Sequence, residues 1–172
     1  MKRITCITLF NENSIDNIKN VVNCTSEKLC KVPYSEINRE KVDLLPYHIT
    51  LQSWNENEKK EAIKVFDSII IDKIKLIVKG ISIKKGKDEA YNLYLQINEN
   101  KKLESIYKQL YKITQNQKYN PETYMPHITI HTDRDYDKIL YIKRKLERDF
   151  REFEIEFEKI GLFEIYPIIK IK

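Results

Sequence analysis

The chain has 172 residues, a length typical of a single domain, and a net charge of +5 that permits an acidic partner without demonstrating one. No apolar run approaches the roughly 20 residues needed to cross a bilayer, and the first residues lack a signal-peptide cleavage pattern, so we expect a cytoplasmic protein. The three cysteines, Cys6, Cys24 and Cys30, form no Cys-x-x-Cys pair, which argues against a disulfide framework or a zinc knuckle. We expect them to be reduced and mostly buried.

The first half of the chain reads as strand, helix, loop, strand, helix and strand. Alternating apolar residues favour strands, and apolar residues at helical spacing favour helices. The predicted elements are a strand over 2–10, a helix over 13–31, a loop over 34–46, a strand over 47–54, a helix over 56–71 and a strand over 73–84 with a possible bulge at Gly80.

The second half repeats this order. It contains a strand over 90–97, a helix over 103–113, a loop over 115–126, a strand over 127–132, a helix that follows its cap Asp133 and extends to Phe150, and a last strand pair bent at Gly161. We infer a single domain over 1–172, built as a duplication with halves 1–87 and 88–172. The expected fold is α+β: a bilobal, pseudo-twofold arrangement of two mainly antiparallel sheets, flanked by helices around a central cleft.

The tripeptide His-Ile-Thr occurs twice, beginning at His48 and at His127, and uses two of the three histidines. Alternation along a strand predicts that His48 and Thr50 share one face, and that His127, Thr129 and His131 do the same in the second half. An imidazole moves protons near neutral pH, and a threonine hydroxyl donates to phosphate oxygens. Two such pairs, one from each half, are suited to flank one phosphorus atom.

The paired motifs and the matching order of elements resemble the two-histidine (2H) phosphoesterases, whose bacterial members include 2′-5′ RNA ligase-like proteins and RNA 2′,3′-cyclic phosphodiesterases. The resemblance covers essentially the whole chain. It implies a bilobal fold with a phosphate in the central groove. It also implies that His48 and His127 are the catalytic pair and that Thr50 and Thr129 bind the phosphate.

The chain departs from that family pattern after each motif. Gln52-Ser53-Trp54 stands where many ligase-like members have Phe and then Gly, and Thr132 stands where many have Arg five residues after the second histidine. We therefore expect Gln52 and His131 to supply the missing donors to the substrate. Trp54 and Tyr124 flank the motifs and belong either to the core or to a surface that stacks on a nucleobase.

Two further features bear on the ligand. The cluster Lys84-Lys85-Gly86-Lys87 is typical of a solvated hairpin tip and matters for a polyanion only if it borders the histidine cleft. The histidines lack the supporting carboxylate or thiol spacing of a metal site, so we expect neither a metal nor another cofactor.

These observations predict metal-independent hydrolysis of 2′,3′-cyclic phosphate ends of RNA or of nucleotides. One neutral imidazole activates water and the opposite imidazolium protonates the leaving ribose oxygen. The same site suits reverse 2′-5′ RNA ligation, and the sequence does not distinguish acid from base. Two alternatives stay open: a non-catalytic module that binds RNA or nucleotide phosphate, and a transphosphorylating nuclease that forms cyclic ends. The expected partners are RNA ends or small cyclic nucleotides, with neither a membrane nor an obligate protein partner.

Overall fold

The computed structural model describes residues 3–26, 29, 45–86, 89–111, 123–165 and 169–170. In chain order the elements are β1 (Arg3–Phe10), α1 (Glu12–Val22), β2 (Thr50–Asn55), η2 (Glu56–Glu58), α3 (Lys59–Ser68), β3 (Ile74–Lys85), β4 (Tyr91–Ile97), α4 (Lys101–Tyr111), β5 (His127–Asp133), α5 (Tyr136–Glu147), β6 (Phe153–Ile165) and β7 (Ile169–Lys170). The predicted order of strands and helices is confirmed in both halves. The end of the predicted helix 13–31, most of the loops 34–46 and 115–126, Cys30 and Lys87 lie outside the described residues.

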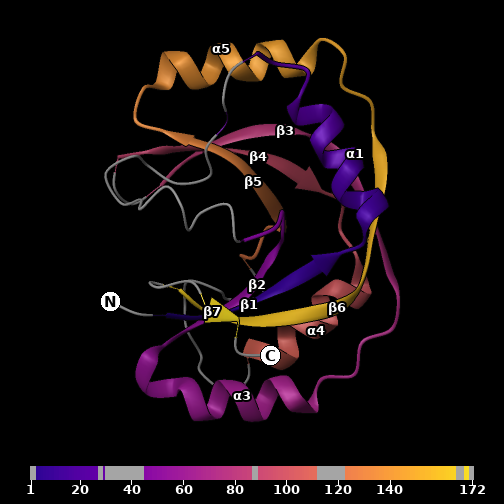
Figure 1. The fold of residues 1–172 in the computed structure, drawn as a ribbon, viewed down its shortest axis with the longest axis vertical. Helices are drawn as coiled ribbons and strands as arrows, with labels where there is room; N and C mark the ends of the chain where they lie inside the picture. The colour runs from indigo at the N-terminus through magenta and orange to yellow at the C-terminus, as the bar shows by residue number, and fades with distance from the viewer. Residues whose placement is uncertain are drawn as a thin grey trace.

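The strands form one antiparallel sheet in the order β2-β1-β6-β3-β4-β5, with β7 beside β6 (Figure 1). If β1, β2 and β3 are exchanged for β4, β5 and β6, the same order is obtained in reverse. The sheet is therefore pseudo-symmetric about the β6–β3 pair, and the predicted α+β duplication is confirmed.

The expected separation into two sheets is not confirmed, because β6 is a single strand of 13 residues that belongs to both lobes. Its first part, Phe153 to Phe157, pairs with β3, and its later part pairs with β1. The expected break at Gly161 is absent, since Gly161 lies within the strand opposite Ile7. A methyl group at Gly161 would lie 2.6 Å from Cε2 of Phe163, so close approach of this side chain accounts for the glycine.

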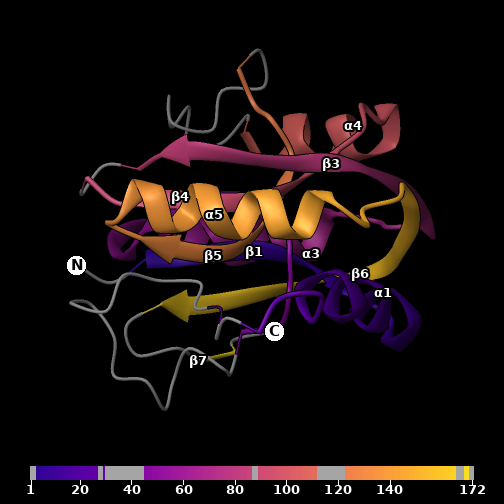
Figure 2. The same ribbon diagram turned by 90° about the horizontal axis from the view of Figure 1, so that it is seen from above.

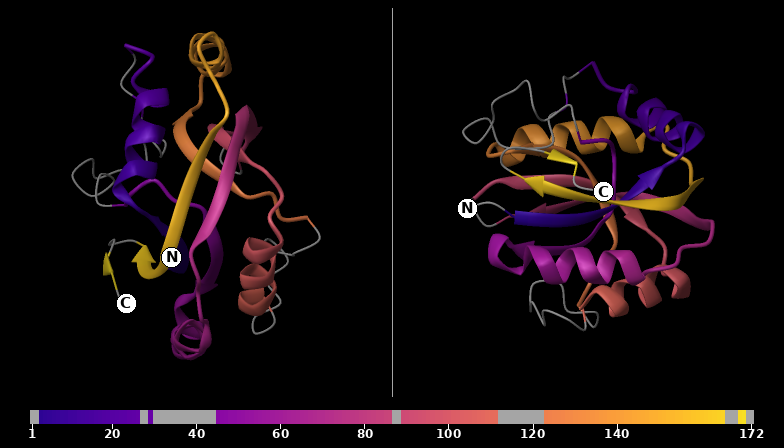
Figure 3. Two further views of the ribbon diagram at one scale, coloured as in Figure 1. Left: turned by 90° about the vertical axis from the view of Figure 1, so that its right-hand side faces the viewer. Right: turned by 60° about the horizontal axis from the view of Figure 1, so that its bottom comes forward.

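The helices cover the outer side of each lobe. Figure 1 shows α5 above β3, β4 and β5, with α3 and α4 below β1 and β2, and Figure 2 shows α5 lying along the strands that it covers. The first helix of each half packs on the other lobe: α4 contacts β2, and α1 packs where β6 leaves β3 (Figure 3). This exchange of helices and the shared strands β3 and β6 fix one lobe against the other. No helix in the described residues is long and apolar enough to span a membrane.

Local side-chain contacts set the ends of the helices. Asn11 caps α1, because its Oδ1 accepts a bond of 2.9 Å from the Ser14 backbone amide. The predicted cap of α5 is corrected from Asp133 to Asp135, whose side chain accepts from the Lys138 amide at 3.1 Å. Asp133 instead ends β5 and accepts from the Asp135 amide.

The two described cysteines differ in environment. Cys6 is fully buried, and this burial raises the pKa of its thiol far above the usual range. Cys24 is exposed, contrary to the general expectation of buried cysteines. A neutral, buried Cys6 is a core residue of β1 and not a reactive thiol.

Candidate functional site

The first His-Ile-Thr strand carries a β-bulge directly after its threonine. Thr50 pairs with Ile7 of β1, and Gln52 pairs with Cys6, which leaves Leu51 as the extra residue. Because Ile7 and Cys6 are neighbours on β1 and point to opposite faces, Thr50 and Gln52 also point to opposite faces.

The second motif has the same bulge at the same place. Thr129 pairs with Tyr94 of β4, and His131 pairs with Leu93, so Ile130 is the extra residue. The expectation that His131 shares a face with Thr129 is therefore wrong, as is the matching expectation for Gln52. In both cases the alternation that the sequence suggests is interrupted by one residue.

In the first lobe, Gln52 and Trp54 point toward the helices. This side of the sheet is identified by Glu164, which pairs with Ile4 of β1 and whose carboxylate contacts Lys59 Nζ of α3 at 3.0 Å. Trp54 pairs with the same Ile4 and is 1% exposed. Gln52 is fully buried, and its Oε1 accepts from the Ser53 amide at 2.8 Å. Trp54 is thus a core residue and not a stacking platform.

His131 lies on the corresponding helix side of the second lobe. The pair Tyr91 and Asp133 shares this face, and Tyr91 packs on Tyr136 at the start of α5, with ring centroids 4.9 Å apart. His131 is 2% exposed, with its Nε2 3.8 Å from Asp133 Oδ2. The structure therefore places the third histidine under α5.

The bulges bring two other residues to the histidine side of the sheet. Ser53 Oγ lies 3.1 Å from Thr5 Oγ1 on β1, and Thr132 Oγ1 donates to Asn92 Oδ1 on β4 at 2.8 Å. The two pairs occupy equivalent positions in the two halves. Ser53 and Thr132 are buried, so these bonds brace the strands that carry the motifs.

The two motif histidines are held in the same way. His48 Nδ1 lies 2.8 Å from the Pro46 carbonyl oxygen, and His127 Nδ1 lies 2.7 Å from that of Met125, in each case two residues earlier. A carbonyl only accepts, so Nδ1 carries the proton and Nε2 of the neutral ring keeps its lone pair. Each imidazole is thereby fixed in the tautomer that takes a proton at Nε2 and, once charged, returns it from there.

A contact across the halves brings the two motifs together. Tyr124, three residues before His127, donates its hydroxyl to the Thr50 carbonyl at 2.7 Å. Its ring stacks on Tyr107 of α4, with centroids 3.6 Å apart. In Figure 1, β2 and β5 begin near each other at the centre of the molecule. Tyr124 therefore serves as a link between the motifs, and its contacts leave the predicted stacking on a nucleobase without support.

The surroundings of His127 favour its neutral form. Burial lowers the pKa of the ring, the bond to the Met125 carbonyl opposes this effect, and the positive charge of Lys84 lowers the pKa further. The ring also packs edge-on against Tyr94, with centroids 5.1 Å apart. A neutral His127 at neutral pH is suited to accept a proton.

Lys84 is the residue near this site whose position the sequence did not reveal. Its strand, β3, pairs with β4 so that Lys84 is opposite Asn92, which in turn is opposite Thr132. The three residues therefore share the histidine face, whereas Lys85 points to the helix side. Alternation along β3 was visible in the sequence, but the face that points to the cleft was not.

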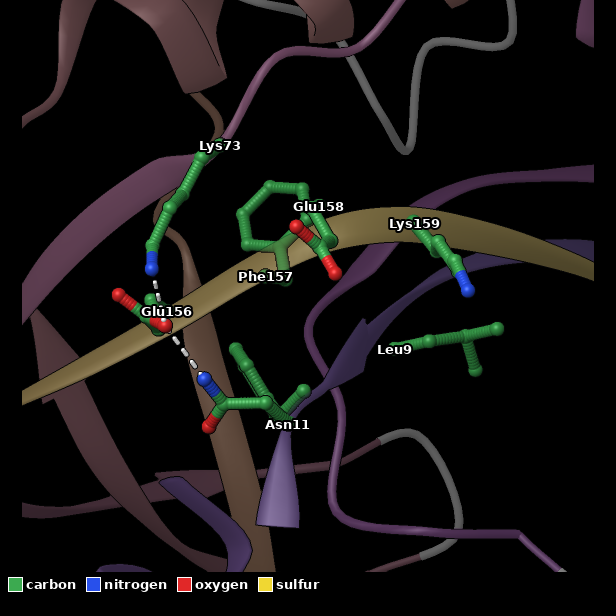
Figure 4. Close-up of a pocket in the computed structure, with 8 residues that line it drawn as sticks. Leu9, Asn11, Lys73, Glu156, Phe157, Glu158 and Lys159 are labelled. Carbon is green, nitrogen blue, oxygen red and sulfur yellow. Dashed lines mark hydrogen bonds and ion pairs between the residues drawn. The ribbon is translucent and has the colours of Figure 1, made fainter. Parts of the chain in front are cut away.

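A separate hollow of about 190 Å³ lies where β1 ends beside β6 (Figure 4). Glu156 is held there by Lys73 at 2.7 Å and by Asn11 at 2.5 Å. None of the motif residues lines it. Neither in this hollow nor in the rest of the described residues is a group of three or more His, Cys, Asp or Glu side chains arranged to hold a metal ion.

Comparison with known proteins gives a family match over part of the chain and two similar folds. Residues 95–167 match the family model for LigT like phosphoesterases. The fold is similar to the apo crystal structure of Escherichia coli LigT, with a TM-score of 0.53 and 11% identity, over 95% of this chain and 87% of that one. It is also similar to Kluyveromyces marxianus Usb1, with a TM-score of 0.51 and 12% identity, over 98% and 97% of the two chains. No curated protein sequence matches.

The second half of the chain, residues 95–167, therefore resembles the LigT like phosphoesterases, and the whole chain has the fold of LigT and Usb1.

Proposed function

We propose that the protein is a metal-independent phosphodiesterase that opens 2′,3′-cyclic phosphates at RNA ends or on nucleotides, with His48 and His127 as the acid and base. The matched bonds from each Nδ1 to a backbone carbonyl, 2.8 and 2.7 Å long, are the observation that best supports this proposal. They give both rings the tautomer that proton transfer at Nε2 requires. The RNA end as substrate class follows from the family resemblance.

The lowered pKa of His127 favours it as the base. In the proposed reaction its Nε2 accepts a proton from water while the water oxygen bonds to phosphorus. The bond from phosphorus to one ribose oxygen breaks, and the His48 imidazolium donates its proton to that leaving oxygen. Thr50 and Thr129 donate to the non-bridging oxygens, where negative charge grows in the transition state. If the 5′-hydroxyl of a second RNA replaces water as the nucleophile and the 3′-oxygen is the leaving group, the same two proton transfers give a 2′-5′ linkage.

Phosphorus NMR of the purified protein tests this proposal with a 2′,3′-cyclic mononucleotide and a short RNA that ends in a cyclic phosphate, both in EDTA. We expect turnover in the wild type and a loss of about 10²- to 10⁴-fold in His48→Ala and His127→Ala, the range for a general acid or base. His131→Gln is the matched control, because the third histidine lies under α5. The position of the phosphate in the product identifies the bond that is cut.

The alternatives give different results in the same assay. Binding of the cyclic-phosphate RNA without turnover of any substrate would identify a phosphate-binding module. Release of a 2′,3′-cyclic product from linear RNA would identify a transphosphorylating nuclease. Loss of turnover in EDTA would contradict metal independence.

A further inference from the structure

We infer that the strand of an RNA substrate upstream of its cyclic end lies along the β4–β3 face of the second lobe, where Lys84 contacts a backbone phosphate that is not the reacting one. The inference rests on the proposed function and goes beyond it, because it predicts a preference for RNA over a mononucleotide. It depends on the strand register, on exposure and on charge.

The register places three polar rows side by side on the histidine face. His127 lies opposite Gln96 and Gly80, Thr129 lies opposite Tyr94 and Ser82, and Thr132 lies opposite Asn92 and Lys84. Contacts confirm this face, since the Tyr94 ring meets the His127 ring and Asn92 bonds to Thr132. The rows lead from the catalytic imidazole across the sheet to Lys84.

Polar residues on this path are open to solvent. Six of them are partly or fully exposed: His127, Thr129, Gln96, Ser82, Asn92 and Lys84. Among the described residues, none forms an ion pair with Lys84, whereas other lysines such as Lys59 and Lys138 are paired with carboxylates. An unpaired ammonium beside exposed amide and hydroxyl groups suits a ribose-phosphate chain.

The equivalent face of the first lobe is different. Gly161 occupies the position that matches Ser82, and Phe163 the position that matches Lys84, with Ile7 in place of Tyr94. Ile7 is fully buried and Phe163 is 7% exposed. The polar, cationic surface next to the motifs in the described residues therefore belongs to the second lobe, which fixes the side on which a charged chain lies.

The distance along β4 between the rows of His127 and Lys84 separates the Lys84 contact from the reacting phosphate. Gln96 and Asn92, which mark the rows of His127 and Lys84, are four residues apart on β4, or about 13 Å at the usual rise of a strand. Lys84 is thus placed beyond the phosphorus between the two imidazoles and toward the next part of the chain. Its positive charge still acts on His127, consistent with a shared surface.

The test compares two substrates and two neighbouring lysines. The ratio of kcat/KM for a cyclic-phosphate RNA of several nucleotides to kcat/KM for the cyclic mononucleotide is measured in the wild type, Lys84→Gln and Lys85→Gln. Lys85 is the matched control because it is exposed on the same strand but points to the helix side. The ratio cancels any effect of Lys84 on His127, since both substrates react at the same imidazole.

We expect the ratio to fall about two- to fivefold in Lys84→Gln, the effect of one exposed ionic contact, and to stay at the wild-type value in Lys85→Gln. The salt dependence of RNA binding should also lose about 0.7 in logarithmic slope, the value for one phosphate contact on a single strand. An equal loss in both variants, or an unchanged ratio in Lys84→Gln, would overturn the inference. An inactive wild type on both substrates, with RNA binding that is insensitive to Lys84→Gln, would refute the proposed function and the inference together. If the wild type is inactive but the salt dependence of RNA binding decreases in Lys84→Gln and not in Lys85→Gln, only the catalytic proposal fails.

Discussion

The His127 imidazole is suited to act as a base because its environment disfavours a second ring proton. A base must be neutral, and the pKa of His127 lies below its ordinary value, first through burial and then through the charge of Lys84. We therefore expect the rising limb of the pH profile of kcat/KM to lie below the usual histidine range near pH 6.5. Replacing Lys84 with Gln removes a positive charge, so the limb should move to higher pH.

The measurement is a pH–rate profile of the wild type, Lys84→Gln and Lys85→Gln, with an NMR titration of His127 in the inactive His48→Ala variant. The titration shows whether the kinetic limb belongs to His127. A limb above the ordinary histidine value, or one that moves equally in both lysine variants, would contradict the assignment of His127 as the base.

At the level of single residues, the sequence singles out the two motif histidines but does not show to which face of the sheet the neighbouring side chains point. His48 and His127 could be singled out because they repeat, and the structure holds both in one tautomer. The burial of Trp54 was not predictable, since a strand that packs under helices and a strand that borders a cleft have similar local sequences. The link made by Tyr124 depends on a contact between halves that are distant in sequence.

The β-bulges are the feature at the level of elements that the sequence concealed. Uninterrupted alternation along each strand predicts that Gln52 and His131 lie on the same face as the threonines. Leu51 and Ile130, the extra residues, are ordinary apolar strand residues, and neither marks a bulge as a glycine would. The bulge at Gly80 was predicted from its glycine and is confirmed by the register shift there.

The bulge of β5 predicts opposite consequences for two neighbouring substitutions. Thr129→Val removes a hydroxyl that faces the motifs, so we expect a loss of roughly 10²-fold in kcat and less than about 1 kcal/mol in stability. His131→Gln perturbs a buried side chain under α5, so we expect a loss of about 1–3 kcal/mol with kcat of the folded protein within about twofold of wild type. Urea unfolding and initial rates distinguish the two. A large loss of kcat in His131→Gln with normal stability would show that His131 acts in the site and not only in the packing under α5.

The continuity of β6 gives a prediction for Gly161. An alanine methyl would lie 2.6 Å from Cε2 of the buried Phe163 and 3.3 Å from Cδ1 of Leu9. We expect Gly161→Ala to lower the free energy of unfolding by about 1–3 kcal/mol through overpacking. Gly80→Ala is the control, because its nearest neighbour is the flexible end of Gln96 at 2.9 Å. Equal unfolding midpoints for the two variants in urea would show that Phe163 moves aside without cost.

At the scale of the whole molecule, the duplication made the fold predictable. Two similar orders of strands and helices implied two similar lobes, and the palindromic strand order follows once β3 and β6 pair at the centre. The sequence did not show that these strands are long enough to serve both lobes, so the expected two sheets are one. Length of pairing depends on the partner strand, which local patterns do not specify. The boundary between halves at 87/88 stays a prediction.

Tyr124 provides a contact between the lobes that lies close to both motifs, because it precedes His127 by three residues and bonds to Thr50. Tyr124→Phe removes the bond to the Thr50 carbonyl and keeps the ring that stacks on Tyr107. We expect a loss of about 0.5–1.5 kcal/mol in stability, the usual value of a neutral hydrogen bond.

Because small misplacements of catalytic groups are costly, kcat should fall further than this modest destabilisation suggests, by about 3- to 30-fold. Tyr141→Phe is the control, since Tyr141 is 51% exposed and contacts Lys145 on the surface of α5. The measurements are kcat at a temperature where both variants are fully folded and the urea midpoint of each. A normal kcat in a destabilised Tyr124→Phe would mean that the hydroxyl stabilises the fold without positioning the histidines, and that the shared strands β3 and β6 align the motifs unaided.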